Sequence, residues 1–319
     1  MQGDDAASAA ASAIARRRSL HKRLNDRSSR TLIIGAISTL AGGACWGFSG
    51  TCVSFLFEHY EINPFWLLCM RQFFAGSLFV ILALATDRDR LFRLWRTPAH
   101  LRILFAFMIF GLLSNQLLYL LAIRFTNAGT ATVLQALQLL VIMGYACVSG
   151  HRTPKPREII GLALALVGTV LIATGGDLST MAIPPIGLAV GLLNALAAAL
   201  FTIIPRGILR EYGSASVTGS AMFLCGAVSM VIERPWTAVP ALDPFGWGAF
   251  AVLVVVGSFL AFLLYMHGVA EIGSLRAGLL GTIEPISATV TSALLLGTVF
   301  TGPDLAGFAM IIVMMFLTT

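Results

Sequence analysis

Ten apolar stretches, each about 17 to 25 residues long, follow one another along this chain and decide what it can fold into. They lie at residues 32–57, 64–85, 102–123, 128–149, 157–174, 183–205, 214–232, 244–267, 273–296 and 303–318. A helix of this length crosses the roughly 30 Å hydrocarbon core of a bilayer. Charged residues make up only 11% of the chain, whereas about 25% is usual in a soluble domain. The sequence therefore predicts an all-α membrane protein with ten transmembrane helices.

The basic residues indicate how these helices are oriented. If the N-terminus lies in the cytoplasm, 18 of the 21 Lys and Arg residues fall on the inner side, and Arg124 and Arg234 fall on the outer side. The positive-inside rule then favours ten spans with both termini in the cytoplasm. We therefore expect a multi-pass protein of the bacterial inner membrane. Residues 1–31 are predicted to be a disordered, basic cytoplasmic tail. Because this bias accounts for the net charge of +6, we expect no nucleic-acid partner.

Two parts of the chain match each other without a gap at an offset of 146 residues. The identical pairs are Gly111 and Gly257, Leu117 and Leu263, Leu118 and Leu264, Tyr119 and Tyr265, Ala131 and Ala277, Leu134 and Leu280, Gly161 and Gly307, and Ala163 and Ala309. This register lays the third to fifth stretches on the eighth to tenth. Since five is odd, the two halves must have opposite orientations. We therefore expect two inverted five-helix repeats, 32–174 and 183–319, with substrate near the midplane at their interface.

The dipeptide Glu284-Pro285 lies near the middle of the ninth stretch. At 1.5 Å per residue, Glu284 is about 16 Å from the inner end of that helix. A carboxylate at this depth costs about 2.5 to 3.5 kcal/mol on insertion scales, and the proline frees a helix carbonyl that needs another partner. Two interpretations stay open. Glu284 binds substrate or a proton, or it is a neutral carboxyl group that caps carbonyls freed by Pro285.

Other polar and aromatic residues fall at similar depth and complete a candidate cavity. The candidate substrate-binding residues are Trp46, Asn115, Tyr119, Gln135, Gln138, Asn194, Tyr265 and Glu284. Gln138 is the repeat counterpart of Glu284, so a pseudo-twofold axis would bring the two toward each other. Buried Asn and Gln also join helices through hydrogen bonds of about 0.6 to 2 kcal/mol, and tyrosines also anchor helix ends at the membrane surface. These structural alternatives stay open.

Arg71 is a further charged residue inside a predicted span. It lies about 11 Å below the outer surface, counted at 1.5 Å per residue, and it needs an acid, carbonyl groups or a substrate carboxylate as its partner. We take it as a possible coupling or structural charge, and the sequence favours a structural tie.

Several short motifs occur in a fixed order over residues 32–319. They are the small-Trp-Gly run Ala44 to Gly47, Pro64 with Arg71, the turns from Tyr119 to Ala131 and from Tyr265 to Ala277, Glu284-Pro285, and the glycines Gly161 and Gly307. As an ordered set they resemble the drug/metabolite transporter superfamily, particularly its EamA-type ten-helix transporters. Leu139 replaces a proline common in the family, and Arg152 and Thr298 replace two glutamates. The resemblance implies alternating-access movement of small metabolites, often amino-acid export.

The leading hypothesis is therefore an exporter of amino acids or related small metabolites. Efflux of cationic lipophilic compounds is an alternative, because Glu284 and aromatic walls could hold a cation, and so is a facilitator without coupling. A membrane receptor or scaffold is the alternative outside transport. An enzyme is not expected, since paired acids, histidine clusters and nucleophile–base pairs at one depth are missing from the sequence. We expect a small-molecule substrate and the lipid bilayer as partners, no cofactor or metal, and a monomer or homodimer.

Overall fold

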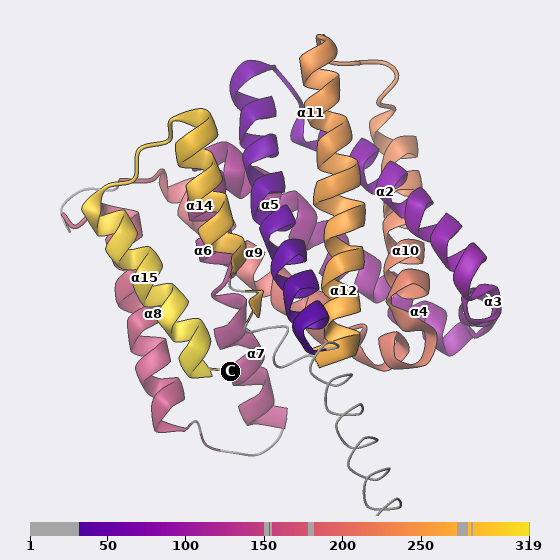
Figure 1. Cartoon of the computed structure of the whole chain (residues 1–319), viewed down its shortest axis with the longest axis horizontal. Coiled ribbons are helices and arrows are strands. Elements are labelled where there is room, and N and C mark those ends of the chain that lie inside the picture. The colour runs from indigo at the N-terminus through magenta and orange to yellow at the C-terminus, as the bar shows by residue number, and fades with distance from the viewer. Residues whose placement is uncertain are drawn as a thin grey trace, which may run out of the picture.

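The computed structural model describes residues 32–149, 153, 155–177, 182–272, 280–281 and 283–318. Within these ranges the chain consists of helices packed side by side, with no strand (Figure 1). Eight helices are long and apolar enough to cross a membrane, and two shorter apolar helices follow them. Together they correspond to the ten predicted stretches. The predicted tail, 1–31, lies outside the described residues.

Most helix boundaries follow the predicted stretches closely. In the ninth stretch, predicted at 273–296, the described helix begins at Ile283, and residues 273–279 lie outside the described residues. In chain order the helices are Leu32–His59, α2 Pro64–Thr86, α3 Arg88–Arg96, α4 Pro98–Ala106, η1 Phe107–Leu113, α5 Ser114–Phe125, α6 Ala128–Gln135, α7 Gln138–Ser149, α8 Pro156–Thr174, α9 Pro185–Ile203, α10 Arg206–Glu233, α11 Pro244–Val254, η2 Val255–Leu260, α12 Ala261–Ile272, α14 Ile283–Leu296 and α15 Gly302–Thr318. Four spans are built from more than one segment or contain an interruption. The third is α4, η1 and α5; the fourth is α6 and α7; the seventh, α10, bends at Gly213; and the eighth is α11, η2 and α12.

Local sequence signals explain where several helices begin. The Asn63 side chain accepts a hydrogen bond from the Phe65 amide at the start of α2, and Asp243 does the same for Gly246 at the start of α11. Each cap is followed by a proline at the first helical position, where its missing N–H group costs nothing. At the other end of α8, Gly175 takes the left-handed conformation that stops the helix, with φ of 62°.

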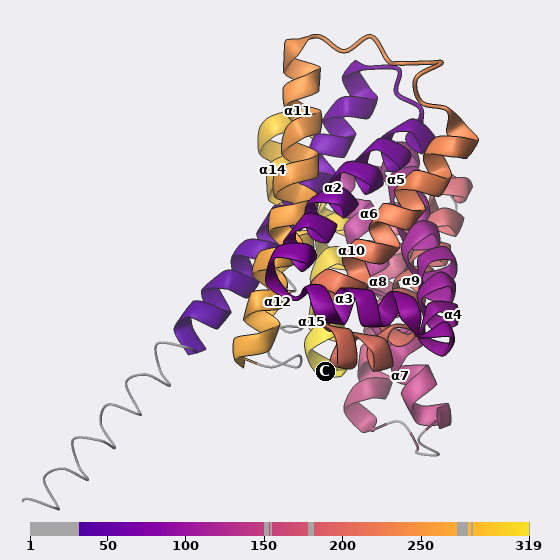
Figure 2. The same cartoon turned by 90° about the vertical axis from the view of Figure 1, so that its right-hand side faces the viewer.

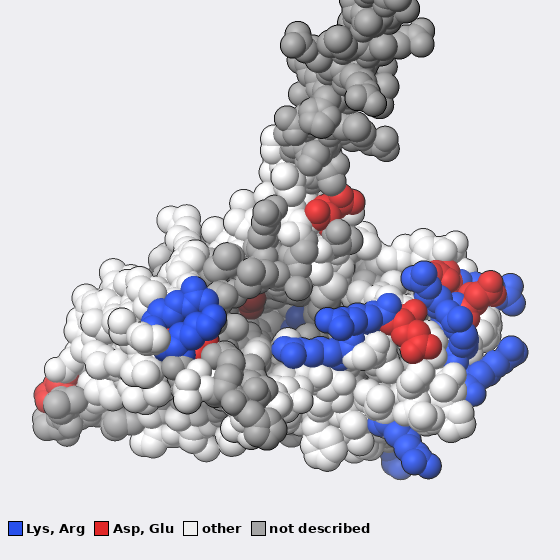
Figure 3. Space-filling model, turned by 90° about the horizontal axis from the view of Figure 1, so that it is seen from below, with Lys and Arg blue, Asp and Glu red and all other residues white. Residues whose placement is uncertain are grey.

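Helix α3 lies between the second and third predicted stretches, where the sequence shows only a run of arginines and apolar residues. Leu91 and Leu94 are buried, and the Trp95 indole N–H donates to Ser220 Oγ on α10 at 3.1 Å. The four arginines of α3 are exposed. Figure 3 shows that Lys and Arg side chains gather on this lower face of the molecule. The helix therefore lies against α10 with its charged side toward solvent, as expected for a helix at a membrane surface.

Both halves of the fold contain a π-helical segment, and the two occupy matching positions. Gly111 lies in η1 and Gly257 in η2, and these glycines are the pair related by 146 residues. The fourth span is interrupted at Ala136 and Leu137, where the Ala136 amide is shared between the Thr132 and Val133 carbonyls and the Leu137 amide bonds to the Leu134 carbonyl, three residues back. In the same register, α14 begins at Ile283. The architecture is thus ten helices in two inverted five-helix repeats, and the exact boundaries of the repeats stay a prediction.

Hydrogen bonds tie the loop after the first helix to the last residue of α10 and to the loop before α11. The Tyr60 hydroxyl donates to Asp243 Oδ1 at 2.6 Å, and Asn63 Nδ2 donates to Glu233 Oε1 at 3.2 Å. The hydrogen bond from Tyr60 holds the pKa of the Asp243 carboxyl below its usual range, and it raises the pKa of the Tyr60 hydroxyl. The charged form of Asp243 is therefore the one that this contact stabilises.

We expect Tyr60→Phe to lower the melting temperature by no more than a few degrees at pH 7, because this contact is exposed and such contacts are weak. A depressed carboxyl pKa gives stability that is present above the unfolded pKa, about 3.9, and is lost as the pH falls through the lower folded value. The difference between wild type and Tyr60→Phe should therefore shrink below about pH 4. Thermal melts of the detergent-solubilised protein from pH 7 to pH 3 test this. A difference that stays constant over that range would contradict the prediction.

Candidate functional site

One face of the first helix brings several predicted site residues together. Gly50 lies four residues after Trp46 and three after Gly47, so it shares a face of the helix with each of them. The centroid of the Trp46 ring lies 4.8 Å from the ring centroids of Phe262 and Tyr265 on α12. A Cβ atom placed on Gly50 would lie 2.7 Å from the hydroxyl oxygen of Tyr119. This face therefore carries contacts to α12, through Trp46, and to α5, through Gly50.

The same face places α14 against the first helix. A Cβ atom on Gly47 would overlap the backbone carbonyl oxygen of Glu284. Side-chain hydrogen bonds hold the helices together. Ser287 Oγ donates to the Ala44 carbonyl at 2.9 Å, and Thr51 Oγ1 lies 2.5 Å from Thr291 Oγ1 and 3.3 Å from Ser292 Oγ. Because Gly47 is near the middle of Leu32–His59, the backbone of Glu284 lies about midway along a membrane-spanning helix. This agrees with the predicted depth.

Glu284 stands in the first turn of α14, just before the buried Pro285. The carbonyl that Pro285 frees, four residues back, belongs to Gly281, and it accepts a hydrogen bond from the Glu284 backbone N–H at 3.0 Å. That carbonyl therefore has a partner that is not the carboxyl group. In the described ranges no Lys, Arg or His forms an ion pair with Glu284. Its carboxylate is half-buried and lies close enough to Tyr119 and Tyr265 to interact electrostatically with both.

Tyr119 lies in the packed interior, with 8% of its surface exposed. Its hydroxyl oxygen is 3.0 Å from Thr132 Oγ1 on α6, and Thr132 Oγ1 donates to the Ala128 carbonyl at 2.6 Å. Since a threonine hydroxyl has one proton, Tyr119 is the donor to Thr132. This burial differs from what an anchor at the membrane surface would show.

Two of the four predicted amide side chains bond to each other, and the other two are not part of this pair. Gln135 Nε2 donates to Asn115 Oδ1 at 3.4 Å, a long hydrogen bond that joins α6 to α5. Gln138 is half-buried at the start of α7, and in the described part of the chain no hydrogen bond links it to Glu284. Asn194 is fully buried on α9, and neither of its amide atoms has a hydrogen-bond partner among the described residues. The pairing of Gln138 with Glu284 stays a prediction.

Arg71 reaches from α2 to the π-helical segment of the second repeat. Its Nε–H donates to Ser258 Oγ at 2.7 Å, and the side chain keeps 5% of its surface exposed. It interacts electrostatically with Tyr119 and with Cys52. Arg71 and Glu284, a basic and an acidic side chain, therefore both lie near Tyr119.

Sequence reasoning missed several residues around this site. Ser258 bonds to Arg71, Thr132 bonds to Tyr119, and the Phe262 ring packs edge-to-face against Trp46. Gln72, next to Arg71, is 1% exposed, and both of its amide atoms lack partners within the described ranges. Ser258 could have been found from the sequence, because it is a polar residue next to Gly257, one of the glycines that the repeat relates.

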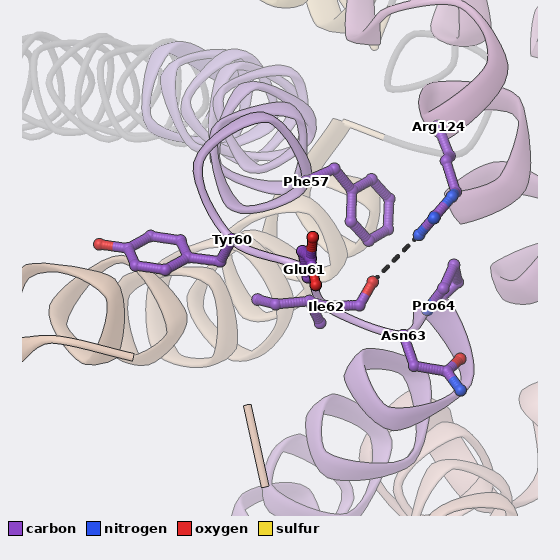
Figure 4. Close-up of a pocket in the computed structure, with 7 residues that line it drawn as sticks. All are labelled: Phe57, Tyr60, Glu61, Ile62, Asn63, Pro64 and Arg124. Carbon is purple, nitrogen blue, oxygen red and sulfur yellow. Dashed lines mark hydrogen bonds between the residues drawn. The ribbon is translucent and has the colours of Figure 1, made fainter. Parts of the chain in front are cut away.

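A separate depression lies among the end of the first helix, the loop that follows it and Arg124 of α5 (Figure 4). Its volume is about 550 Å³, and it is lined by Phe57, Tyr60, Glu61, Ile62, Asn63, Pro64 and Arg124. Arg124 Nη1 donates to the Ile62 carbonyl at 3.1 Å, and its guanidinium group lies 5.8 Å from the centre of the Phe57 ring. Phe57 is seven residues, about two turns, beyond Gly50. The depression is thus outside the site but on the same face of the first helix.

The part of the chain that the structure describes contains no cluster of side chains suited to bind a metal ion. No three His, Cys, Asp or Glu side chains there are placed to hold a metal ion. The site instead combines one acid, one arginine, aromatic rings and amides, which is a set suited to binding an organic molecule.

Comparisons with known proteins agree with this architecture. Residues 33–174 and 185–319 match the family model described as EamA-like transporter family. The uncharacterized inner membrane transporter YicL of Salmonella typhimurium is 31% identical over 278 residues, which cover 87% of this chain and 92% of that protein. The uncharacterized transporter YyaM of Bacillus subtilis is 24% identical over 192 residues, which cover 58% of this chain and 62% of that protein.

A solved crystal structure has a similar fold. It superposes with a TM-score of 0.60 and covers 91% of this chain and 96% of its own, at 18% sequence identity. At that identity the likeness concerns the fold alone. Since the family matches cover both halves and the Salmonella relative, at 31% identity, is an inner membrane transporter, this chain is a multi-pass inner-membrane transporter that belongs to the EamA-like transporter family.

Proposed function

We propose that this transporter exports amino acids or related small metabolites by alternating access, with substrate bound beside Glu284 between the two repeats. Inverted repeats support such a mechanism, because each half can open to one side of the membrane while the other closes. The matching π-helical segments η1 and η2 give each half a comparable irregular element, and such elements are frequent at functional sites.

The observation that carries the proposal is the position of Glu284. Its carboxylate has no ion-pair partner among the described residues, although its backbone packs midway along the first helix. Trp46, Tyr119 and Tyr265 lie around the same point. A carboxylate kept at this depth without a basic partner is available to a cationic group of the substrate or to a proton. In this proposal it alternates between the two, which couples export to proton entry.

The remaining predicted residues take supporting roles in this proposal. Asn115 and Gln135, bonded to each other, supply amide groups between α5 and α6. Gln138 and Asn194 come into contact with substrate in a conformation where the fourth and sixth spans have moved apart. The repeats span 32–174 and 183–319, and the basic lower face (Figure 3) is the cytoplasmic one, so both termini lie in the cytoplasm. The protein acts as a monomer or homodimer without a cofactor.

A second candidate is efflux of cationic lipophilic compounds. The observation in its favour is the aromatic cluster beside the acid, in which Trp46 lies 4.8 Å from both Phe262 and Tyr265. Aromatic faces next to a carboxylate attract organic cations. The two candidates differ in whether the substrate also carries an anionic group.

Flux measurements in proteoliposomes test the proposed function. Radiolabelled amino acids, nucleobases and lipophilic cations are offered to the purified protein, and saturable flux of one or more amino acids is expected. Trp46→Ala should raise the apparent KM about tenfold, since it removes a large aromatic surface from the site. Trp236→Ala is the matched control, because Trp236 is 64% exposed in the loop before α11. Absence of saturable flux for every compound would overturn the proposal.

A further inference from the structure

We infer that Arg71 binds the anionic group of the substrate, so that the site accepts zwitterions such as α-amino acids, with the carboxylate at Arg71 and the ammonium group at Glu284. This inference rests on the proposed transport function and narrows its substrate class.

The first observation is that Arg71 is a buried charge without a counter-ion. Only 5% of its surface is exposed, and no Asp or Glu of the described residues forms an ion pair with it. A guanidinium group has five N–H donors, and one of them, on Nε, is used by a described residue. The Nη1 atom is buried and has no partner there. A charge in this state is strongly disfavoured unless an acceptor joins it, and a substrate carboxylate is such an acceptor.

The second observation is that Arg71 is held from one side only. Ser258 Oγ donates to the Leu253 carbonyl at 3.2 Å, five residues back in the π-helical segment, so its lone pairs are free to accept from Arg71. Ser258 is fully buried. This contact fixes the Nε edge of the guanidinium group and leaves the two terminal nitrogens unassigned. A fork of two N–H groups is the geometry that binds a carboxylate through two parallel hydrogen bonds.

The third observation is that Arg71 and Glu284 are held at nearly the same level along the first helix. Gly257, the neighbour of Ser258, packs against Ser49 of the first helix, and Glu284 packs against Gly47. Two residues along a helix correspond to a rise of about 3 Å. Both charges interact electrostatically with Tyr119, and they form no ion pair with each other. Arg71 and Glu284 therefore both lie near Tyr119, at similar depth, without forming an ion pair with each other.

This arrangement selects among the substrate classes. A lipophilic cation would pair with Glu284 and leave Arg71 without an acceptor. A dianion such as a phosphate ester would need more than the one positive charge that Arg71 supplies, and it would be repelled by Glu284. A zwitterion provides one partner for each group, so it is the class whose binding satisfies both buried charges.

Proteoliposome transport with matched ligands tests the inference. The probe is the radiolabelled amino acid that the wild type moves best, and the competitors are its α-amide and its decarboxylated amine, which lack the carboxylate. Both competitors are expected to bind wild type at least ~30-fold more weakly than the amino acid. Arg71→Gln should raise the apparent KM of the amino acid ~30-fold or more and change the amide and the amine less than ~3-fold. Discrimination by the carboxylate would then be lost.

Three further variants separate binding from folding. Arg71→Lys keeps the charge but not the fork, so the KM should rise about tenfold for the amino acid alone. Ser258→Ala should act in the same direction, because it releases the Nε edge. Arg124→Gln, which changes the arginine of the outer depression, is the matched control and should alter KM less than about twofold. If Arg71→Gln does not fold, Arg71→Lys and Ser258→Ala still report selective loss.

The outcomes distinguish this inference from the function on which it rests. Equal effects of the Arg71 variants on amino acid, amide and amine would show a structural tie and overturn the inference. Wild-type flux of cations without flux of amino acids would also overturn it, while transport itself would stand. Absence of flux for every compound would remove the proposed function, and the inference with it.

Discussion

Glu284→Gln is expected to abolish the pH dependence of substrate flux and to lower flux about 30-fold or more at neutral pH. The substitution keeps the size and hydrogen-bonding capacity of the side chain but removes its charge and its ability to carry a proton. Losing one member of a desolvated charge interaction costs at least 2 kcal/mol, which corresponds to about that factor. The fold should be little affected, because the Gly281 carbonyl freed by Pro285 is bonded by the Glu284 backbone N–H rather than by its carboxyl group.

Counterflow and net flux are measured in proteoliposomes from about pH 5.5 to about pH 8.5, a range of roughly three pH units around neutrality. Melting temperatures are recorded in parallel. Glu58→Gln is the matched control, since Glu58 is an exposed acid near the C-terminal end of the first helix. It should retain wild-type flux and pH dependence. Unchanged pH dependence in Glu284→Gln would exclude a proton-carrying role. A large loss of thermal stability with flux retained would instead support the structural interpretation of this acid.

The fold was predictable to a large extent because the bilayer itself sets the length of each apolar helix. The fourth stretch, 128–149, matches α6 and α7 at both ends, and the second ends one residue earlier than α2. Proline and its preceding cap residue mark the start of α2 and of α11. These signals are local, so a sequence contains them in full.

Features that depend on neighbouring helices were not predictable in the same way. The interruption at Ala136 and Leu137 occurs without a proline, and Leu139 had replaced the family's usual one. The π-helical segments also have no local signature beyond their glycines. Such irregularities are chosen by the packing that surrounds them. Helix α3 was hidden for another reason, since its nine residues are too few and too charged to resemble a span.

The candidate site was likewise predictable where local sequence signals set it and not where it depends on contacts between distant helices. The depth counted along the helices put Trp46 at the level of Glu284, and Tyr119 and Tyr265 were expected to wall the same cavity. The structure places these four residues near one another around the first helix. The bond of Ser258 to Arg71 joins residues 187 positions apart. No spacing rule could have paired them, because the contact exists only when η2 is packed beside α2. The meeting of Gln138 and Glu284 stays a prediction of the pseudo-twofold relation.

Tight packing between α2 and α10 leads to the second large effect. These helices lie side by side (Figure 2), and glycines on each one admit the backbone of the other. A Cβ atom on Gly226 would overlap the backbone nitrogen of Phe73, and one on Gly76 would overlap that of Phe223. Within a membrane, helices associate through close van der Waals contact at small residues. This pair of glycines therefore sets the distance between the two repeats at this point.

Gly226→Leu is expected to lower the melting temperature by 10 °C or more, or to prevent recovery of folded protein, because overpacking costs about 1 to 3 kcal/mol even where only side chains must move. Here the overlap is with backbone atoms, so the whole helix must shift. Gly248→Leu is the matched control, since nothing lies within 4 Å of a Cβ atom at that position of α11. Size-exclusion profiles and thermal melts in one detergent compare the two. If Gly248→Leu destabilised the protein equally, leucine itself and not the α2–α10 contact would be the cause.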